Sequence, residues 1–268
     1  MRKSFIVGAA AAILAAPAMA ADLPVKAPAY KAAPVAPGYD WTGFYLGGHV
    51  GGGWNSGNLR ADYLPFPDFN VFPTLANSSA TGVLGGVQAG YNWQFASRWV
   101  LGVEGDFSGT RMNSTLTVVP QQIAPPVPIP TQPTTWSRNL NWLATARARV
   151  GYTVAPSVLL YATGGAAWGG FGDNASFVNT APGSNNWANP FSATSSGYVV
   201  GGGGEWMLTN NWTVRAEYLY YRLSGKSNLA TNPVFPTFPI LFSWNATDTH
   251  TVRVGVNYKF GGPVVARY

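Results

Sequence analysis

The chain has 268 residues and a formal net charge of +6, and only 10% of its residues are charged although 47% are hydrophobic. It has no cysteine, which excludes disulfide bonds, zinc–thiolate sites and cysteine nucleophiles. The 14% aromatic content argues against disorder. Lysines and arginines are scattered singly along the chain and form no basic cluster, which argues against nucleic-acid binding. Soluble proteins carry about a quarter charged residues, so we expect part of this surface to face something other than water.

The first 20 residues have the pattern of a secretory signal peptide. A positive pair at 2–3 precedes an apolar segment at 5–16, and an A-x-A cleavage site follows at 18–20. The alternative is a membrane anchor, but the apolar segment is shorter than the ~20 residues that span a bilayer as a helix. We therefore expect export and cleavage between Ala20 and Ala21.

Residues 21–40 form the next predicted segment, which reads ADLPVKAPAYKAAPVAPGYD. Its four prolines interrupt any regular helix or strand, and its two lysines together with the amino group that cleavage leaves outnumber its two aspartates, so it is weakly basic. We expect an extended arm that begins at Ala21 and Asp22 and lies in the periplasm.

From position 41 onward, apolar residues recur at every second position, as in a β-strand with two different faces. Between 87 and 95, every odd position is apolar, and Gln88, Asn92 and Gln94 stand between them. In the segment at 140–152, we expect the apolar face to point outward and to begin with Leu140. Eight segments have a face without charge, near 44–54, 87–95, 99–107, 140–152, 158–168, 198–208, 212–220 and 252–260.

The connections between these segments are of two kinds. Short ones lie near 96–98, 153–157 and 209–211, and long ones near 55–80, 109–138, 170–196 and 223–247. Fourteen of the 21 prolines lie in the long connections and none in a predicted strand, where proline would remove a ladder hydrogen bond. This alternation is typical of outer-membrane barrels. The sequence therefore predicts an all-β fold, an eight-stranded antiparallel up-and-down transmembrane β-barrel at 41–260, with short periplasmic turns, long extracellular loops and a tail at 261–268.

Aromatic residues gather at the ends of the predicted strands, whereas the strand centres carry Val, Leu, Ala and Gly. The alternative fold, a secreted β-sandwich, buries its apolar face in a core and gives no reason for this arrangement. Two aromatic girdles around an aliphatic band match the two interfaces of a membrane. The predicted girdle residues are Trp54, Phe95, Trp99, Phe107, Trp142, Tyr152, Trp168, Tyr198, Trp206, Trp212, Tyr220, Tyr258 and Phe260.

Charged residues of the strands fall on the opposite face, which we expect to line the lumen. Pairing Leu208 with Trp212 across the 209–211 turn would place Glu205 opposite Arg215. The hypotheses are an ion-pair network that plugs a narrow barrel, a charged pore, or a paired-carboxylate catalyst. The near balance of acids and bases favours the plug, because buried charges persist only when paired. The predicted network comprises Glu104, Asp106, Arg147, Arg149, Glu205, Arg215, Glu217, Arg253 and Lys259.

The sequence predicts no catalytic residue, no metal site and no cofactor. His49 is expected to point inward and His250 lies near the loop end of the last strand, but neither has the neighbours that a metal site or a hydrolase needs. The glycine runs at 51–53 and 201–204 lie in predicted strands and do not open a helix, so they are not phosphate loops.

Six motifs together resemble one family: WTGFY at 41–45, GVEGDF at 102–107, RARVGY at 147–152, YATGGA at 161–166, RAEYLY at 215–220 and VRVGVNYKF at 252–260. They resemble the small outer-membrane β-barrel proteins of alphaproteobacteria, the RopB-like surface antigens of the porin family. That barrel is similar to the transmembrane domain of OmpA. The resemblance covers about 40–260 and implies a protein of the cell outer membrane that stabilises the envelope and displays surface loops.

The resemblance also implies partners. Outer-membrane lipid and lipopolysaccharide would surround the barrel, the outer-membrane assembly machinery would insert it, and Ala21 and Asp22 would carry an amide link to peptidoglycan. Such barrels end on an aromatic residue of the last strand, and here Phe260 and Tyr268 are the two candidates for this assembly signal. The implied function is structural. A small passive-diffusion porin is the alternative, and a secreted binding module is a third hypothesis.

Overall fold

In a computed structural model, the chain is described over residues 39–63, 76–118, 134–177, 187–231 and 240–261. The predicted signal peptide with its cleavage site at Ala20–Ala21 lies outside these residues, as do nearly all of the arm and of the tail. The described residues contain ten β-strands: β1 (Gly43–Tyr63), β2 (Ala76–Phe95), β3 (Trp99–Val118), β4 (Thr134–Ala155), β5 (Val158–Phe177), β6 (Trp187–Met207), β7 (Trp212–Leu223), β8 (Lys226–Ala230), β9 (Ile240–Trp244) and β10 (Thr247–Lys259).

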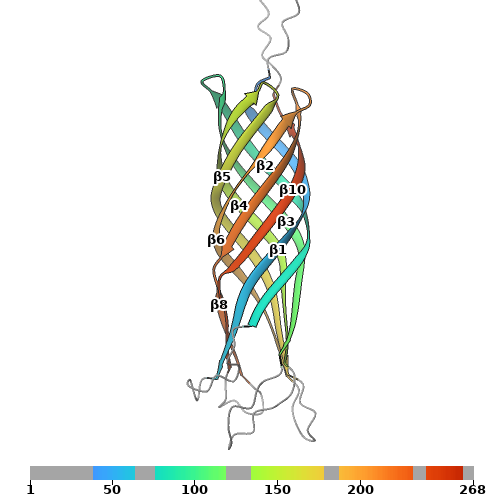
Figure 1. Cartoon of the computed structure of the whole chain (residues 1–268), viewed down its shortest axis with the longest axis vertical. Coiled ribbons are helices and arrows are strands. Elements are labelled where there is room, and N and C mark those ends of the chain that lie inside the picture. The colour runs from blue at the N-terminus through green and yellow to red at the C-terminus, as the bar shows by residue number, and fades with distance from the viewer. Residues whose placement is uncertain (1–38, 64–75, 119–133, 178–186, 232–239, 262–268) are drawn as a thin grey trace, which may run out of the picture. The chain divides into compact units, whose positions relative to one another are not determined.

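Eight of these strands form a closed ring in which every neighbouring pair is antiparallel (Figure 1). Its order is β1–β2–β3–β4–β5–β6–β7–β10, and the ring closes because β10 also pairs with β1, with Val254 opposite Val50. β8 and β9 form a hairpin that adds to β1 at one end of the ring. The ring confirms the predicted all-β, eight-stranded antiparallel fold.

The two faces of each strand differ sharply in exposure. On β10, Val252, Val254 and Val256 are between 45% and 55% exposed, whereas Arg253 is 1% exposed. Successive side chains of a strand point to opposite faces, so the aliphatic residues cover the outside of the ring and the charged residues fill its interior.

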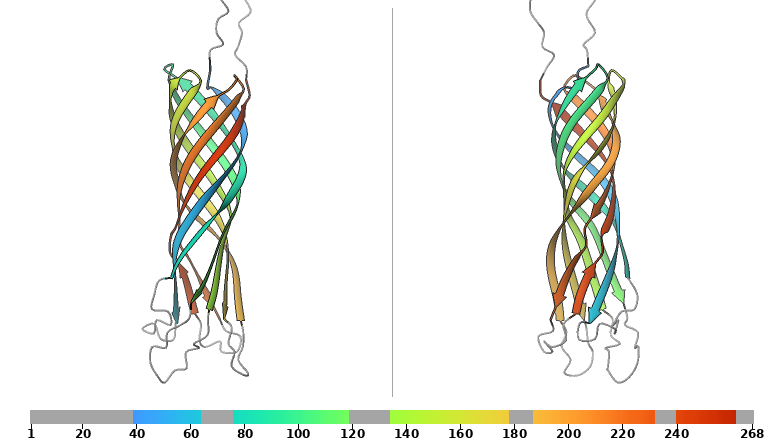
Figure 2. Two further views of the ribbon diagram at one scale, coloured as in Figure 1. Left: turned by 45° about the vertical axis from the view of Figure 1, so that its right-hand side comes forward. Right: turned by 90° about the vertical axis from the view of Figure 1, so that its left-hand side faces the viewer.

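The short turns lie together at one end of the ring, which we call the turn end (Figure 2). In the turn after β2, Ala96 and Ser97 have φ angles of 46° and 64°, and Arg98 N donates to Ala96 O at 2.8 Å. The turn is tight enough that two non-glycine residues adopt the left-handed conformation. The opposite end is called the loop end below.

At the loop end, the boundaries predicted for the long connections are wrong. β1 continues to Tyr63 and β2 begins at Ala76, inside the expected loop at 55–80, and the other three expected loops also contain strand residues. Pro190 lies within β6. The extensions are rich in Ser, Thr and Asn and lack an outward apolar set, so hydrophobic alternation ends while the backbone ladder continues.

A β-bulge in β4 corrects one further prediction. The pairing of β4 with β5 shifts between Leu140 and Trp142, which leaves Asn141 as the extra residue, and on the other side residues 110–111 of β3 both face Asn141. A bulge changes the face on which the following residues lie. Leu140 is therefore buried inside the ring at 1% exposure, and its predicted outward position is wrong.

At the loop end the ring divides into two four-stranded sheets, which we call the cap. In one sheet, β2 residues 76–81 pair with β1, β1 with β9, and β9 with β8. In the other, β3 residues 113–118 pair with β4, β4 with β5, and β5 with β6. The inner faces of the two sheets meet: the Trp136 and Phe242 rings lie 5.5 Å apart at 90°, and the Arg138 guanidinium lies 4.5 Å from the Trp244 ring.

Inward glycines make room for the crowded interior. A Cβ atom on Gly86 would lie 2.0 Å from the carbonyl oxygen of Phe107, and one on Gly47 would lie 2.1 Å from the side-chain oxygen of Asn257. Such contacts are far below van der Waals distance, so these positions need glycine to let neighbouring strands and side chains approach.

Candidate functional site

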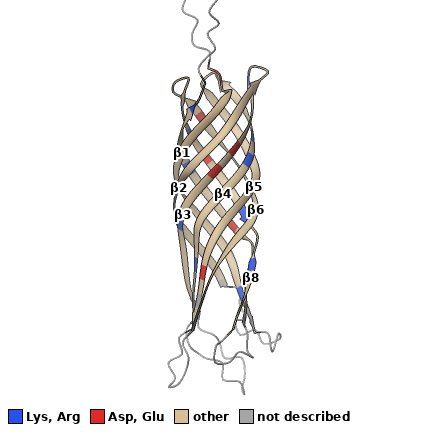
Figure 3. Cartoon of the chain, turned by 180° about the vertical axis from the view of Figure 1, so that it is seen from behind, with Lys and Arg blue, Asp and Glu red and all other residues tan. Residues whose placement is uncertain are grey.

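The interior of the ring is the candidate functional site, and β7 shows how it is layered. Its inward residues change from Arg215 and Glu217 to Leu219, Tyr221 and Leu223 on the way from the turn end to the loop end. On β4, Arg149 and Arg147 are likewise followed toward the loop end by Leu143 and Leu140. A layer of charged residues therefore lies between two apolar layers, and Figure 3 shows the Asp and Glu positions of the strands among those of Lys and Arg.

Arg147 lies at the centre of the charged layer. Its Nη1 lies 2.9 Å from Glu217 Oε1, its Nη2 lies 3.1 Å from Asp106 Oδ2, and Nη2 also contacts Glu104. The Arg147 side chain is completely shielded from solvent, and its three acidic partners are at most 2% exposed. One guanidinium thus joins carboxylates from two other strands, β3 and β7.

Two further arginines complete this group. Arg253 Nε lies 2.7 Å from Glu217 Oε2, and Arg253 Nη1 lies 3.0 Å from Asp106 Oδ1. Arg215 contacts Glu104 and lies 3.6 Å from Glu217. Guanidinium groups suit such sharing because they present several donors in a fixed plane.

Glu205 has a different partner from the predicted one. The backbone register places Glu205 opposite Arg215, as the turn at 209–211 predicts. Its carboxylate nevertheless pairs with Arg149, at 3.2 Å, and accepts hydrogen bonds from Thr213 and Asn257. The predicted Glu205–Arg215 ion pair is therefore wrong, because the long Arg215 side chain extends along the lumen to Glu104 instead.

Lys259 does not join the network. Its ammonium group donates to the backbone carbonyl of Asp40 at the turn end. Without Lys259, the charged layer contains four carboxylates and four guanidinium groups, so it is formally neutral. The predicted excess of one base in this layer is wrong, since Lys259 is the last residue of β10 and its ammonium group contacts Asp40 O instead of the acids.

Neutral side chains occupy the remaining hydrogen-bonding positions of the charged layer. Tyr45 donates to Glu104, and Gln88 Nε2 donates to Asn257 Oδ1 at 2.6 Å. His49 points inward, as predicted, and its ring nitrogens lie 2.5 Å from Gln88 Oε1 and 2.8 Å from Ser108 Oγ. These residues lie at the inward positions of their strands, but nothing in the sequence singles them out from other inward polar residues.

Two apolar layers enclose the charged layer, and the sequence analysis did not foresee them. The turn-end layer consists of Trp41, Val100, Leu159, Tyr161 and Met207. The loop-end layer consists of Ala80, Leu84, Met112, Leu140, Leu143, Ala167, Phe171, Val199, Leu219, Tyr221 and Leu223. The sequence does contain a signal for the loop-end layer, because on β7 the inward positions after Glu217 are all apolar.

Trp41 closes the turn end of the lumen. It is 1% exposed, its indole Nε1 donates to Pro156 O at 3.2 Å, and its backbone N donates to Gln94 Oε1 at 2.9 Å. Strand β2 and the turn between β4 and β5 thus hold the first residue of the predicted barrel across the mouth of the ring.

The acids of this interior are all engaged in ion pairs. Every carboxylate of the charged layer is held by at least one guanidinium group and is shielded from solvent. Within the described ranges, no group of three His, Cys, Asp or Glu residues is arranged to hold a metal ion. No helix among the described residues is long and apolar enough to cross a membrane.

All thirteen predicted girdle residues lie on the outward face. Nine of them are between 36% and 54% exposed, and the other four, Phe95, Trp142, Tyr152 and Tyr220, are half-buried. His250, which the sequence left without a role, also faces outward, stacks on Trp54 at 5.2 Å and shares a 2.6 Å hydrogen bond with Tyr218.

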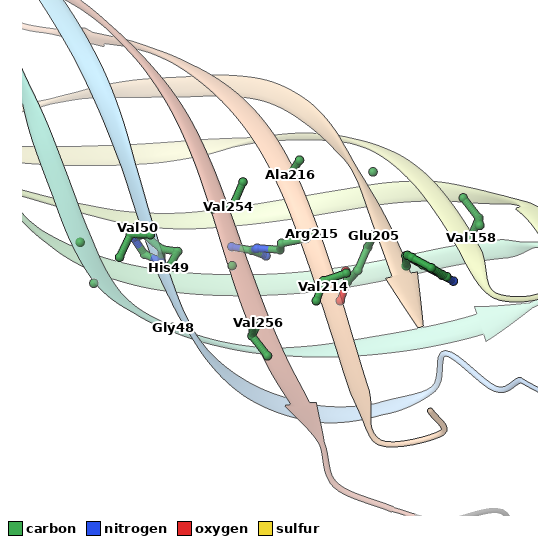
Figure 4. Close-up of a pocket in the computed structure, with 15 residues that line it drawn as sticks. Gly48, His49, Val50, Val158, Glu205, Val214, Arg215, Ala216, Val254 and Val256 are labelled. Carbon is green, nitrogen blue, oxygen red and sulfur yellow. The ribbon is translucent and has the colours of Figure 1, made fainter. Parts of the chain in front are cut away.

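A hollow of about 970 Å³ lies on the outward wall (Figure 4). Exposed Val50, Val254 and Val256 line it, and Gly48 leaves space because a Cβ atom there would find no atom closer than 3.6 Å. Arg215 also borders the hollow but is 4% exposed, on the inward side of β7. The hollow is therefore a feature of the apolar wall and not an entrance to the lumen.

Comparisons with known proteins agree with this architecture. The family model described as outer membrane protein beta-barrel domain matches residues 8–260. The 31 kDa outer-membrane immunogenic protein of Brucella melitensis is 34% identical over 96% of this chain and 100% of its own length. The 25 kDa outer-membrane immunogenic protein of Brucella canis is 30% identical over 97% of this chain and 99% of its own length.

Among solved structures, the outer membrane protease OmpT from Escherichia coli aligns over 84% of this chain and 99% of its own, with a TM-score of 0.52 and 9% identity. At that identity the likeness concerns the fold alone. The two Brucella relatives are named as immunogenic proteins and not as enzymes. By the family match and these full-length relatives, the chain belongs to the outer membrane protein β-barrel domain family and is a protein of the outer membrane.

Proposed function

We propose that this protein is a closed barrel that supports the outer membrane mechanically and presents its cap and loops at the cell surface. The observation that carries the proposal is the filled interior. A neutral network of four arginines and four acids lies between two apolar layers, and Trp41 covers the turn end. A barrel packed in this way resists deformation and offers solutes no continuous polar path.

The alternative is a small passive-diffusion porin. Porins of this kind need a water-filled lumen, whereas here Met112, Leu143 and Leu219 are at most 1% exposed within the loop-end layer. The test is solute entry into liposomes that contain refolded protein. We expect swelling rates in arabinose no higher than in empty liposomes, and a rate that rises with protein content would favour the porin.

The proposed placement in the membrane follows from the outward face. The girdle at Trp99, Trp206 and Trp212 would lie at the periplasmic interface, and the girdle at Trp54 and Trp168 at the outer leaflet, in contact with lipid and lipopolysaccharide. Interfacial aromatic residues support this depth in the membrane, and the short turns at one end support the orientation. Quenching of tryptophan fluorescence by lipids brominated at different depths would show two shallow populations, whereas uniform quenching at the bilayer centre would contradict the placement.

The arm is proposed to attach the barrel to the cell wall. Residues 21–40 are rich in proline and near 3.1 Å per residue would reach roughly 60 Å, and Lys26 and Lys31 suit an anionic polymer. The attachment would use the new terminus at Ala21-Asp22. Muramidase digestion of purified walls should release protein that carries a muropeptide, and a free amino group on Ala21 in every molecule would contradict the link.

Insertion by the outer-membrane assembly machinery is proposed to depend on a terminal aromatic residue. Phe260 is 48% exposed directly after the last strand and packs edge-to-face against Tyr258, with ring centroids 5.0 Å apart, which favours it over Tyr268 as the signal. Phe260→Ala should lower the amount of folded protein in outer-membrane fractions more than Tyr268→Ala does. The opposite ranking would assign the signal to Tyr268.

A further inference from the structure

The two sheets of the cap are separated by two seams, and one of these carries the inference. The ladder between β6 and β7 ends with Gly197 opposite Leu223, and the last backbone bond runs from Ser224 N to Ser196 O at 2.9 Å. Beyond it, residues 187–195 of β6 pair with β5 only, and β8 pairs with β9 only, within the described part of the chain. Two strand edges therefore face each other without a ladder.

The direction of the backbone groups on β6 follows from that last bond. Because Ser196 O points toward the seam and groups alternate along a strand, Thr194 and Ser192 also direct their N–H and C=O groups into it. The backbone of Pro190 faces the same side of the strand, an even number of residues from Ser196. A proline is tolerated in a strand where its missing N–H would face an unpaired edge. The exposed edge is thus consistent with the sequence of β6.

Side chains at the seam add charge and hydrogen-bonding capacity. Lys226 lies opposite Trp244 in the register and so belongs to the inner face of its sheet, yet it is exposed, because no strand covers it on the seam side. None of the described acidic residues forms an ion pair with Lys226. Across the seam, Ser195 is completely buried on the inner face of β6, and its hydroxyl has no hydrogen-bond partner among the described residues.

The second seam differs. It lies between residues 76–81 of β2 and 113–118 of β3, and a 2.8 Å hydrogen bond between Ser78 Oγ and Ser114 Oγ crosses it. The chain therefore bridges this seam with its own side chains. Across the β6–β8 seam, the described residues form no hydrogen bond on the loop-end side of Ser196.

We propose that the seam between β6 and β8 binds an extended segment of another polypeptide, which adds a strand between them. Its backbone would pair with Thr194 and Ser192, a small polar side chain would meet Ser195, and a carboxylate would meet Lys226. Addition of a strand to an exposed edge is an established mode of peptide recognition, in which the backbone supplies affinity and alternate side chains supply specificity. This binding role goes beyond the structural function proposed above.

The probe is a short fluorescent peptide of alternating valine and glutamate, titrated against the full mature protein in detergent and followed by anisotropy. We expect saturable binding. A peptide of the same sequence with N-methyl groups on alternate backbone nitrogens should bind at least about tenfold more weakly, since it has lost its pairing donors. Equal binding of the two peptides, or no binding of either, would overturn the proposal.

Two double variants locate the binding. Ser192→Pro with Thr194→Pro removes two seam-facing N–H groups and should weaken binding about tenfold, whereas the matched Ser192→Ala with Thr194→Val retains the backbone donors and should bind as the original does. A heat-dependent gel shift checks that each variant is folded. Equal affinities of the two folded double variants would place the peptide elsewhere.

Charge reversal tests the side-chain part of the proposal. Lys226→Glu should weaken binding of the glutamate peptide and strengthen binding of a peptide in which lysine replaces glutamate. A variant that treats both peptides as the original does would overturn the assignment of Lys226. Concentration-dependent self-association that is lost in the double proline variant would place a second copy of this chain in the seam, and would overturn the peptide assignment.

Discussion

Glu217 shows how strongly single residues depend on one another inside the barrel. Its carboxylate lies 2.9 Å from Arg147, 2.7 Å from Arg253 and 3.6 Å from Arg215. Removing one member of a buried ion-pair network leaves the remaining charge uncompensated, which costs more than the pair itself contributes.

Glu217→Gln should therefore lower the free energy of unfolding by about 3–5 kcal/mol, measured by urea titration in detergent micelles. Glu205→Gln is the matched control. Glu205 has its main ionic contact with Arg149 alone and accepts hydrogen bonds from two neutral side chains, so this variant should lose less free energy of unfolding. Adding Arg253→Met to Glu217→Gln should recover part of the loss. Two glutamine variants as stable as the original would show that the network contributes nothing.

On the outward face, the effect of a charge should depend on depth. Val254 is 55% exposed near the middle of β10, and Val154 is 51% exposed beside a short turn. Val254→Arg should cost roughly 2–4 kcal/mol and Val154→Arg roughly 0–1 kcal/mol, because arginine is costly at the midplane of a bilayer and not at its interface. Unfolding of both variants in lipid vesicles measures the difference, and equal costs would contradict the proposed position of the membrane.

At the scale of the strands, the sequence predicted the direction of side chains better than the extent of pairing. Hydrophobic alternation places Val254 outward and Arg253 inward correctly, because one face meets an apolar surrounding along the central part of each strand. Hydrophobic alternation cannot detect the bulge at Asn141. Leu140 and Trp142 are both apolar and two positions apart, so the pattern assigns them to one face, whereas the bulge turns Leu140 inward. The alternation also misses the cap, where polar residues form ladders without an apolar outward face.

The cap contains a buried ion pair with a titratable member. Asp173 is 4% exposed on β5, beyond Trp168 and so outside the proposed membrane, and its Oδ1 lies 3.6 Å from Arg138 Nε. Burial raises the pKa of Asp173 from 3.8 to about 6, and the charge of Arg138 opposes this shift only in part. The folded protein thus holds the Asp173 proton more tightly than the unfolded chain does.

For an acid with a raised pKa, stability is greatest below its ordinary pKa and is lost as the pH rises through the folded value. The protein should therefore be more stable at pH 5 than at pH 7.5, by on the order of 1–2 kcal/mol from this residue. Urea titrations of Asp173→Asn should lack this part of the pH dependence, whereas Asp248→Asn should retain it. A pH dependence unchanged by Asp173→Asn would contradict the assignment.

At the scale of the whole molecule, the interior is a sequence of layers, and this order was only half visible in the sequence. The inward charges could be listed because each strand's phase was known. Their partners could not, since Arg215 reaches Glu104 rather than the opposite Glu205, and the length of a side chain decides this. The apolar layers were missed because an inward apolar residue contradicts the usual polar lumen of an outer-membrane barrel.

The central claim is that these layers close the lumen, and single-channel recording in planar bilayers tests it most directly. With refolded mature protein, we expect no stable current steps above the bilayer background at physiological salt, because paired charges and the layers around Trp41 and Tyr221 leave no continuous water path. Reproducible current steps of one size from the unmutated protein would contradict a closed barrel and establish a pore.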